Sequence, residues 1–565
     1  MATLHHAADY PPPLCPVGPR VARIGVTGHR ELPNPDAVRR GVTRVLAELD
    51  ERLSSVNYRY RVLSPLADGA DRLVAECVLQ YHSGSDLEAM LPMPREAYYQ
   101  TFIPAKRAES IKEFEALWNQ AKRQIVLPEP SSHKEAYENV GGYLVEHCEV
   151  LIAVWDGQPE RGRGGTACVV QLARDKNRTV FWLDSVTGEI RSRERVDRFA
   201  ADVAQLKKYN LSPVGADEVS REAEARLLKL EKLAAAAKLD PSVVTPLRKL
   251  VLPQYVKAAW LAHKYQKFYF FVTYVAYLLA AAAVVTAALG ALVYRSSHWI
   301  FLVEVGEISL IMGLTLPHWY RRWQRKWIDH RYLAERLRAA GFLFVVGLDE
   351  DISEPPADLQ LSWLPDDWVV LAMRAVYDSL RHVSGHSPSH HRPKNEAAVG
   401  EFLRLAWIDD QQRYYHQKSK FNRSCHDWLE GSLLCIFAGT ILVAFWHFFL
   451  ATPMAAGWPG IQKWIEHGSE DKLSVVALGL PAIASAIAGI SVFRHFYRIA
   501  ERYEGMSEYL KKISEQIQVP RPAVISATET NLSPLQQLAR AADSAMMHEH
   551  QSWRAVIGVH LPGPG

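Results

Sequence analysis

Glycine and charged residues follow three apolar runs in the first third of the chain, a pattern suited to binding an anion. The runs Val21–Val26, Tyr60–Leu63 and Val150–Val154 have the length and composition of buried strands. The segments that follow them are Thr27-Gly28-His29-Arg30, Ala67-Asp68-Gly69-Ala70-Asp71-Arg72 and Trp155-Asp156-Gly157. A further turn, Gly164-Gly165-Thr166, opens a predicted helix. Glycine lets a phosphate approach the backbone closely, and free amides at a helix start attract negative charge. Arginine can add paired hydrogen bonds to such a group.

These turns also have a purely structural explanation. A single glycine after a strand is usually a turn residue, and His29 can simply bond a neighbouring backbone group. The aromatic residues Tyr98, Tyr99 and Phe102 can stack on a base, but packing beneath a helix is the commoner role and the one we expect. Three glycine turns at one sheet edge, two of them with arginine, favour a ligand site.

Helical patterns separate the strands and predict how the turns are brought together. They cover Asp36–Leu53, a stretch ending near Tyr81, and Ala167–Arg174, before a last strand at Thr179–Leu183. Alternating strands and helices predict an α/β fold, a parallel doubly wound sheet with helices on both faces. Ligands of such sheets bind beyond the carboxyl ends of the strands, where all these turns fall. We expect an anionic ligand, most simply a nucleotide.

Four ordered blocks in this region resemble the SLOG superfamily, which is related to the Smf/DprA and LOG proteins. They are Val26–Arg30, Asp68–Glu76, Leu91–Tyr98, and Trp155–Gly157 with Gly164–Thr166. The resemblance covers about residues 20 to 185 and implies a Rossmann-like fold that binds nucleotides and their derivatives. The expected ligand-binding residues are Gly28, His29, Arg30, Asp68, Gly69, Asp71, Arg72, Trp155, Asp156, Gly157, Gly164, Gly165 and Thr166.

One departure from that family bears on catalysis. LOG-type hydrolases have a Pro-Gly-Gly-x-Gly-Thr-x-x-Glu loop whose glutamate helps to cleave an N-glycosidic bond, whereas this chain has Val169 at the glutamate position. Valine cannot stabilise an oxocarbenium centre or move a proton. We therefore expect binding without turnover by that mechanism and assign no catalytic residue. The carboxylates of Asp71, Glu76 and Asp156 leave another chemistry open.

The second half of the chain contains four apolar segments long enough to cross a bilayer. They are Tyr269–Tyr294, Trp299–Pro317, Trp428–Leu450 and Leu473–Phe496. Lysine and arginine cluster before the first and third segments and after the second and fourth. The positive-inside rule then places both termini and the 320–425 segment in the cytoplasm. We expect a multi-pass protein of the bacterial inner membrane.

The two pairs of spans carry matching flanks. His263–Phe268 resembles His416–Phe421, and Ala334-Glu335-Arg336 resembles Ala500-Glu501-Arg502. This half is similar to the SLATT class of two-span modules, which implies a membrane-disrupting effector of bacterial conflict systems. In the second span Glu304 and Glu307 lie on one helix face, where an oligomer can form an acidic pore ring. The alternative is that they lie at the outer interface, near the start of that helix.

Composition limits the other classes of function. A net charge of +3 is too mild to indicate nucleic acid as a direct partner, and six scattered cysteines indicate neither a disulfide framework nor a metal site.

We divide the chain into a disordered tail (1–20), a SLOG-like domain (21–215), a helical linker (216–250), a first SLATT-like repeat (251–345), a cytoplasmic insertion (346–404), a second repeat (405–519) and a C-terminal helix and tail (520–565).

Three functions follow from this reading. The first is a homo-oligomeric, ligand-gated effector of anti-phage defence that opens a membrane pore. Its ligand would be an ADP-ribose derivative, a cyclic nucleotide or a cyclic oligonucleotide, supplied by a neighbouring signal-producing enzyme, and no cofactor is obligatory. The second is a membrane-anchored nucleotide or nucleoside-phosphate hydrolase, and the third is a membrane scaffold.

Overall fold

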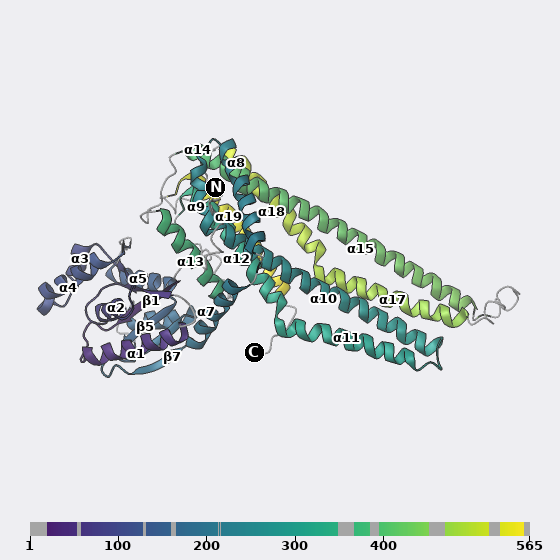
Figure 1. Ribbon diagram of the computed structural model, residues 1–565, viewed down its shortest axis with the longest axis horizontal. Helices are drawn as coiled ribbons and strands as arrows, with labels where there is room; N and C mark the ends of the chain where they lie inside the picture. Colours follow the sequence, from purple (N-terminus) through teal and green to yellow (C-terminus); the bar gives the residue numbers. More distant parts are fainter. Residues whose placement is uncertain are drawn as a thin grey trace, which may run out of the picture. The chain divides into compact units, whose positions relative to one another are not determined.

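The computed structural model describes residues 20–53, 58–127, 132–159, 165–212, 214, 216–348, 367–384, 395–450, 452, 469–518 and 532–558. Within these residues the chain forms two compact units, an α/β unit and a helical unit (Figure 1). The tail expected at 1–20 lies outside the described residues except for Arg20, and the helix and tail expected at 520–565 are described only over 532–558.

A seven-stranded sheet forms the centre of the α/β unit, with the strand order β4-β3-β2-β1-β5-β6-β7. Its strands are β1 (Arg20–Gly28), β2 (Tyr58–Ser64), β3 (Asp86–Leu91), β4 (Arg123–Val126), β5 (Val150–Trp155), β6 (Thr179–Asp184) and β7 (Ile190–Glu194). All neighbouring strands are parallel except β7, which is antiparallel to β6. The chain builds outward from β1 to β4 and then returns to place β5 on the other side of β1. Three strands, β3 and the edge strands β4 and β7, were not among the four predicted strands.

Helices cover both faces of the sheet. They are α1 (Pro35–Leu53), α2 (Ala70–Tyr81), α3 (Arg95–Tyr99), α4 (Arg107–Gln120), α5 (His133–His147), α6 (Thr166–Asp175) and α7 (Val196–Leu211). One apolar cluster joins β1 and β2 to α1, α2, α4 and α7, and a second joins the other face to α5 and α6. The broad predicted layout, an α/β sheet dominated by parallel strands followed by a mostly helical part with four candidate spans, is confirmed.

A helix from the segment between the two membrane hairpins also belongs to the α/β unit. This helix, α13 (Asp367–Ser384), buries one apolar stripe, and the ring of Trp368 lies 5.6 Å from that of Tyr209 on α7. Arg374 is only 3% exposed and donates to Glu149 Oε1 at 3.0 Å and to the Glu146 carbonyl at 2.9 Å. Glu149 Oε2 also accepts the backbone amide of Arg23 at 2.5 Å. The insertion predicted at 346–404 therefore contributes structure to the α/β unit.

The helical unit contains long helices with apolar surfaces. Its helices are α8 (Ala216–Ala236), α9 (Thr245–Leu250), α10 (Leu252–Leu292), α11 (Trp299–Arg321), α12 (Trp323–Val346), α14 (Glu396–Leu403), α15 (Asp409–Leu450), α17 (Ser469–Arg494), α18 (Phe496–Gln518) and α19 (Pro534–Gly558). Among the described residues, four helical stretches, carried by α10, α11, α15 and α17, are long and apolar enough to cross a membrane.

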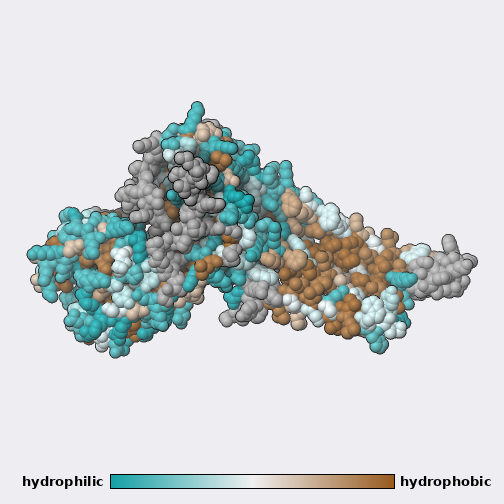
Figure 2. Space-filling model, in the orientation of Figure 1, coloured by the Kyte–Doolittle hydropathy of each residue, from teal (hydrophilic) through white to brown (hydrophobic). Residues whose placement is uncertain are grey.

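Exposed apolar side chains mark where these helices would meet lipid. Leu302 on α11 is 72% exposed and Leu434 on α15 is 71% exposed, and an apolar surface extends along these helices (Figure 2). Helix α10 has 41 residues, or roughly 60 Å at 1.5 Å per residue, about twice the thickness of a hydrocarbon core. Its first half therefore extends out of any bilayer that the second half crosses.

The two hairpins end in the same local geometry. Arg322 lies between α11 and α12 and His495 between α17 and α18, with φ angles of 49° and 50°. The repeated Ala-Glu-Arg segments follow on α12 and α18, but their environments differ. Arg336 is buried and binds both carboxylate oxygens of Asp543 on α19, at 2.8 and 2.9 Å, whereas Arg502 is exposed. The two copies of the repeat therefore share the order of their helices, but the matching arginines differ in burial.

We predict that Arg374→Ala destabilises the α/β unit by about 3–5 kcal/mol, because it leaves the buried carboxylate of Glu149 without its cation. Urea unfolding of the full chain in detergent, followed by hydrogen exchange of β1 and β5, measures this change. The control Arg193→Ala removes an ion pair with Glu48 from a half-exposed side chain and should cost less than about 1 kcal/mol. Equal costs for the two variants would contradict the buried pairing.

Candidate functional site

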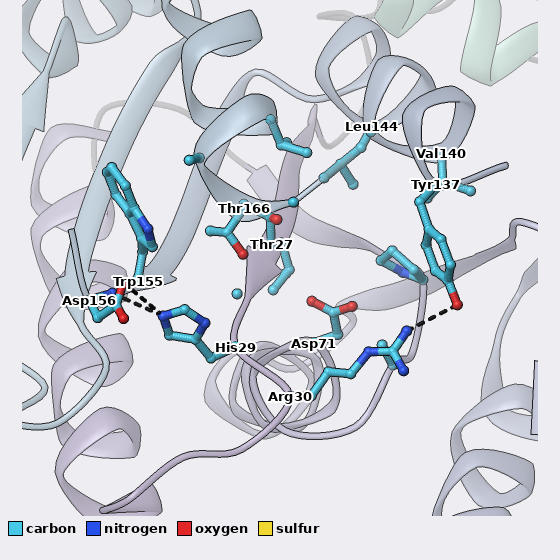
Figure 3. A pocket seen from close by; sticks show the side chains of 18 of the residues that line it. Thr27, His29, Arg30, Asp71, Tyr137, Val140, Leu144, Trp155, Asp156 and Thr166 are labelled. Carbon is cyan, nitrogen blue, oxygen red and sulfur yellow. Dashed lines mark hydrogen bonds and ion pairs between the residues drawn. The ribbon is translucent and has the colours of Figure 1, made fainter. Parts of the chain in front are cut away.

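A cavity of about 400 Å³ opens at the carboxyl ends of β1 and β5, where the strand order of the sheet reverses (Figure 3). Its walls come from the turns after β1 and β5 and from the starts of α2 and α6, with α5 closing one side. This is the usual ligand position in doubly wound sheets, and the volume suits a small molecule. Of the predicted residues, the cavity is lined by Gly28, His29, Arg30, Asp71, Trp155, Asp156, Gly165 and Thr166.

Backbone contacts hold the first two turns against each other. The amide of Ala70 donates to the His29 carbonyl at 3.0 Å, and the amide of His29 donates to the Val154 carbonyl at 3.1 Å. Between them Gly69 has a φ of +80°, and a Cβ at this position would lie 2.2 Å from the Arg30 carbonyl oxygen. Gly69 does not line the cavity; it allows the close approach that shapes it.

His29 joins the turn after β1 to the turn after β5. Its Nε2 lies 3.1 Å from the Asp156 amide nitrogen and 3.2 Å from Asp156 Oδ1. A neutral ring with an unprotonated Nε2 accepts from the amide, whereas a protonated ring pairs with the carboxylate. Figure 3 shows His29 and Asp156 together at one side of the cavity, beside the indole of Trp155. These contacts hold the turn after β5 in place, so that the indole of Trp155 can stack on an aromatic ring of a ligand.

Arg30 supplies a cation on the opposite side. Its guanidinium donates to the Thr101 carbonyl at 2.6 Å and to the Tyr137 hydroxyl at 3.0 Å. Within the described residues no carboxylate lies within ion-pair distance of this guanidinium, so its charge can serve a bound anion. Tyr137 was not predicted, because it comes from α5, over a hundred residues along the chain.

Asp71 points into the cavity with an incomplete set of hydrogen bonds. The residue is 6% exposed, and its Oδ1 has no hydrogen-bond partner among the described residues. Burial raises the pKa of this carboxyl to about 7, although the nearby Arg30 opposes the shift. Figure 3 shows the carboxyl group between Thr27 and Arg30. A buried polar atom without a partner is costly, so Asp71 is suited to accept a hydrogen bond from a ligand hydroxyl or amine.

The start of α6 forms the remaining wall. No side chain caps this helix start, and Gly165, Thr166 and Ala167 line the cavity. A helix start of this kind attracts negative charge. Val169, one turn further, also lines the cavity and is 6% exposed. The resemblance to LOG proteins, which stays a prediction, aligns this apolar side chain with their glutamate.

The other predicted residues lie elsewhere. Arg72 donates to the Leu66 carbonyl at 3.0 Å and to Ser110 at 2.8 Å, and it pairs with Asp68 at 3.0 Å beneath the α3–α4 region. Both side chains hold the fold and do not line the cavity, and Gly157 is also outside it. Gly164 lies outside the described residues. Tyr98, expected to pack, does so against Phe102 and Phe114 but also lines the cavity.

The predicted pore residues lie half-buried on α11. Glu307 Oε1 accepts the Thr286 hydroxyl of α10 at 3.2 Å, so this carboxylate faces its own hairpin partner. The ring that Glu304 and Glu307 would form in an oligomer stays a prediction. Among the described residues no group of three or more histidine, cysteine, aspartate or glutamate side chains is arranged to hold a metal ion.

We predict that Gly69→Ala destabilises the α/β unit by about 2–4 kcal/mol, from the strain of a positive φ (80°, with ψ −116°) plus overpacking against the Arg30 backbone. The matched control is Gly84→Ala, because Gly84 has a φ of +89° with nothing within 4 Å of the added Cβ. It should cost only the backbone strain, about 1–2 kcal/mol. Urea unfolding of the full chain measures both values, and equal costs would contradict the proposed crowding at Gly69.

Asp71 should make the stability of the α/β unit depend on pH. The pKa of this carboxyl is about 7 in the folded chain against an ordinary 3.8, so folding favours the protonated form. The contribution is fully present below about pH 4 and is lost as the pH rises through about 7. Asp71→Asn, which cannot titrate, should flatten this fall in the free energy of unfolding. Asp197→Asn, at a side chain that is 99% exposed, is the control, and parallel profiles for wild type and Asp71→Asn would contradict the assignment.

Comparison with protein-family models finds none that matches the chain, and comparison with curated proteins finds no match either. The resemblance to the SLOG and SLATT families therefore stays a prediction from the motifs named above.

Proposed function

We propose that this chain is a membrane effector gated by a nucleotide-derived ligand. The ligand occupies the cavity of the α/β unit, and its binding energy changes the arrangement of the membrane-crossing helices. The observation that carries the proposal is Asp71, a buried carboxyl with an unpartnered oxygen that faces a cavity also lined by Arg30 and the start of α6.

The groups around the cavity suit the parts of a nucleotide. Arg30 and the amides at the start of α6 favour a phosphate. Asp71 can accept from a ribose hydroxyl, and Trp155 offers an aromatic face to a base. ADP-ribose derivatives, cyclic nucleotides and cyclic oligonucleotides all present these parts, and they are the ligand classes that we propose.

Two strands run from the cavity to the ion pair that holds α13. At its carboxyl end β5 reaches Trp155 and the cavity, and at its amino end it follows Glu149, the partner of Arg374. Similarly, β1 ends at the cavity, and the amide of Arg23 near its start binds Glu149. Helix α13 is covalently joined to α12 on one side and α14 on the other. A shift of β1 against β5 can therefore reach the segment that connects the two hairpins.

The energy available for gating is limited by differential affinity. A ligand that prefers the active arrangement a hundredfold contributes about 2.7 kcal/mol per site, and a ligand with equal affinity for both arrangements shifts nothing. We propose that several chains form a homo-oligomer so that several sites act together. On the charge pattern beside the spans, both termini lie in the cytoplasm of a bacterium, where a neighbouring enzyme can supply the ligand.

A membrane-anchored hydrolase is the second candidate, and one observation favours it. The pKa of Asp71, raised to about 7 by burial, suits proton transfer at neutral pH. Val169 argues against the LOG-type mechanism, since it lines the cavity at the glutamate position. Mass spectrometry of the ligand after incubation separates the two functions, because an effector returns it unchanged.

We predict that Arg30→Ala weakens ligand binding about 10- to 100-fold, the loss of a charge-assisted hydrogen bond. The full chain in dye-loaded liposomes is tested with ADP-ribose, cyclic nucleotides and cyclic oligonucleotides, and binding and dye release are measured together. A bound probe should release dye from wild-type vesicles, and Arg30→Ala should require proportionally more of it.

Two variants sharpen this test. Arg39→Ala removes a cation of the same unit that pairs with Glu76 outside the cavity and should leave both readouts unchanged. Arg374→Ala should keep binding and lose most of the dye release, because it detaches α13. Saturable binding with sealed vesicles in every case would overturn the gating proposal.

A further inference from the structure

A second cavity, of about 180 Å³, lies within the helical unit. It is bounded by α10, α12 and α15 and by the junction between α17 and α18. Residues from both hairpins therefore meet in its wall. Its volume is below the roughly 300 Å³ at which pockets for whole small-molecule ligands begin, and it can enclose a group of about the size of a phosphate.

The wall of this cavity is cationic. Arg331, Lys418 and Arg494 line it, and no aspartate or glutamate appears among the described residues that do so. The remaining polar side chains include Asn422, which is buried, and Tyr503. Three cations that line one small cavity repel one another, so the cavity favours an anion.

Among the described residues, neither Lys418 nor Arg494 has an anionic partner. In the described part of the chain the side chains of Lys418 and Arg494 form no hydrogen bond or ion pair. The Arg494 guanidinium lies 4.2 Å from the Phe270 ring centroid and 4.9 Å from that of Phe496, and Lys418 Nζ lies 5.7 Å from the Phe421 ring. Aromatic rings hold a cation in place without neutralising it.

The cavity lies where the apolar spans end. Phe270 is the second residue of the first predicted span, and Arg494 is the last residue of α17. Both lie at the ends that the charge pattern assigns to the cytoplasm. Two large apolar side chains in this region are exposed: Phe421, which lines the cavity, at 56%, and Val492, next to the lining residue Phe493 in the chain, at 63%. A lipid with its phosphate in the cavity would pair with the cations there, and its acyl chain would contact these apolar side chains.

We propose that this cavity binds a phosphate group, carried by the headgroup of an anionic membrane lipid. Basic pockets between membrane helices on the cytoplasmic side are suited to such headgroups, and guanidinium groups bind phosphate through paired hydrogen bonds. One phosphate contacts Arg494 of the second hairpin, Lys418 of α15 and Arg331 of α12. It relieves their mutual repulsion and ties the inner ends of the two hairpins together. This inference does not depend on the ligand of the α/β unit.

The test uses the full chain in uncharged detergent with phosphatidylglycerol or phosphatidylcholine. Native mass spectrometry counts bound lipid, and thermal unfolding of the helical unit reports stabilisation. Phosphatidylglycerol should bind and raise the unfolding temperature, whereas phosphatidylcholine should do neither. Lys418→Ala and Arg494→Ala should each weaken phosphatidylglycerol binding about tenfold, since each removes a charged contact.

Matched controls lie on the same helices. Lys420→Ala, two residues from Lys418, and Arg498→Ala, one turn beyond Arg494, remove exposed cations that do not line the cavity. They should change binding less than about twofold. Equal losses in all four variants would mean diffuse surface attraction and would overturn the proposal, as would equal stabilisation by phosphatidylcholine. Glycerol 3-phosphate tests whether a soluble phosphate compound binds instead of a lipid. If it alone stabilises the helical unit and Lys418→Ala removes this effect, the phosphate does not come from a lipid.

Discussion

Glu149 and Arg374 form a buried ion pair, and three distant parts of the chain meet through it. Burying two charges is expensive, and the cost is offset only when each finds several partners. Here Glu149 binds both Arg374 and the amide of Arg23, while Arg374 also reaches the Glu146 carbonyl. The amino ends of β1 and β5 are thereby joined to α13. The carboxyl ends of the same two strands build the cavity, so the ligand site and the attachment of α13 share one stiff element about 20 Å long.

The two cavities differ in charge in a way that matches two kinds of anion. The cavity of the α/β unit combines Arg30 with Asp71 and Asp156, so it suits a ligand that carries hydroxyl groups as well as phosphate. The cavity of the helical unit combines three cations with aromatic rings and lies at the ends of apolar spans, so it suits a headgroup alone. We propose that the first responds to a signal in solution and that the second ties the helices of the two hairpins together in the membrane.

The sequence predicts those parts of the fold that depend on local patterns. Continuous apolar runs identify β1, β2, β5 and β6. The missed strands β3, β4 and β7 are short and carry polar or charged residues, as in Arg123–Val126 and Ile190–Glu194. The glycine turns identify most of the cavity for the same reason. The prediction that Arg72 lines the cavity was wrong. Arg72 and Asp71 are adjacent on α2, and a helix directs adjacent side chains to different faces. Tyr137 and the docking of α13 arise from contacts between residues 107 and 225 positions apart, which no local pattern contains.

Hydrogen exchange of the full chain in lipid, with and without a bound probe such as ADP-ribose or a cyclic nucleotide, tests the central claim most directly. The account predicts that occupancy of the cavity changes exchange at its turns, in α13, and at the inner ends of α10 and α15. A bound probe whose effect stops at the turns around Asp71, with α13 and the membrane helices unchanged, would contradict it.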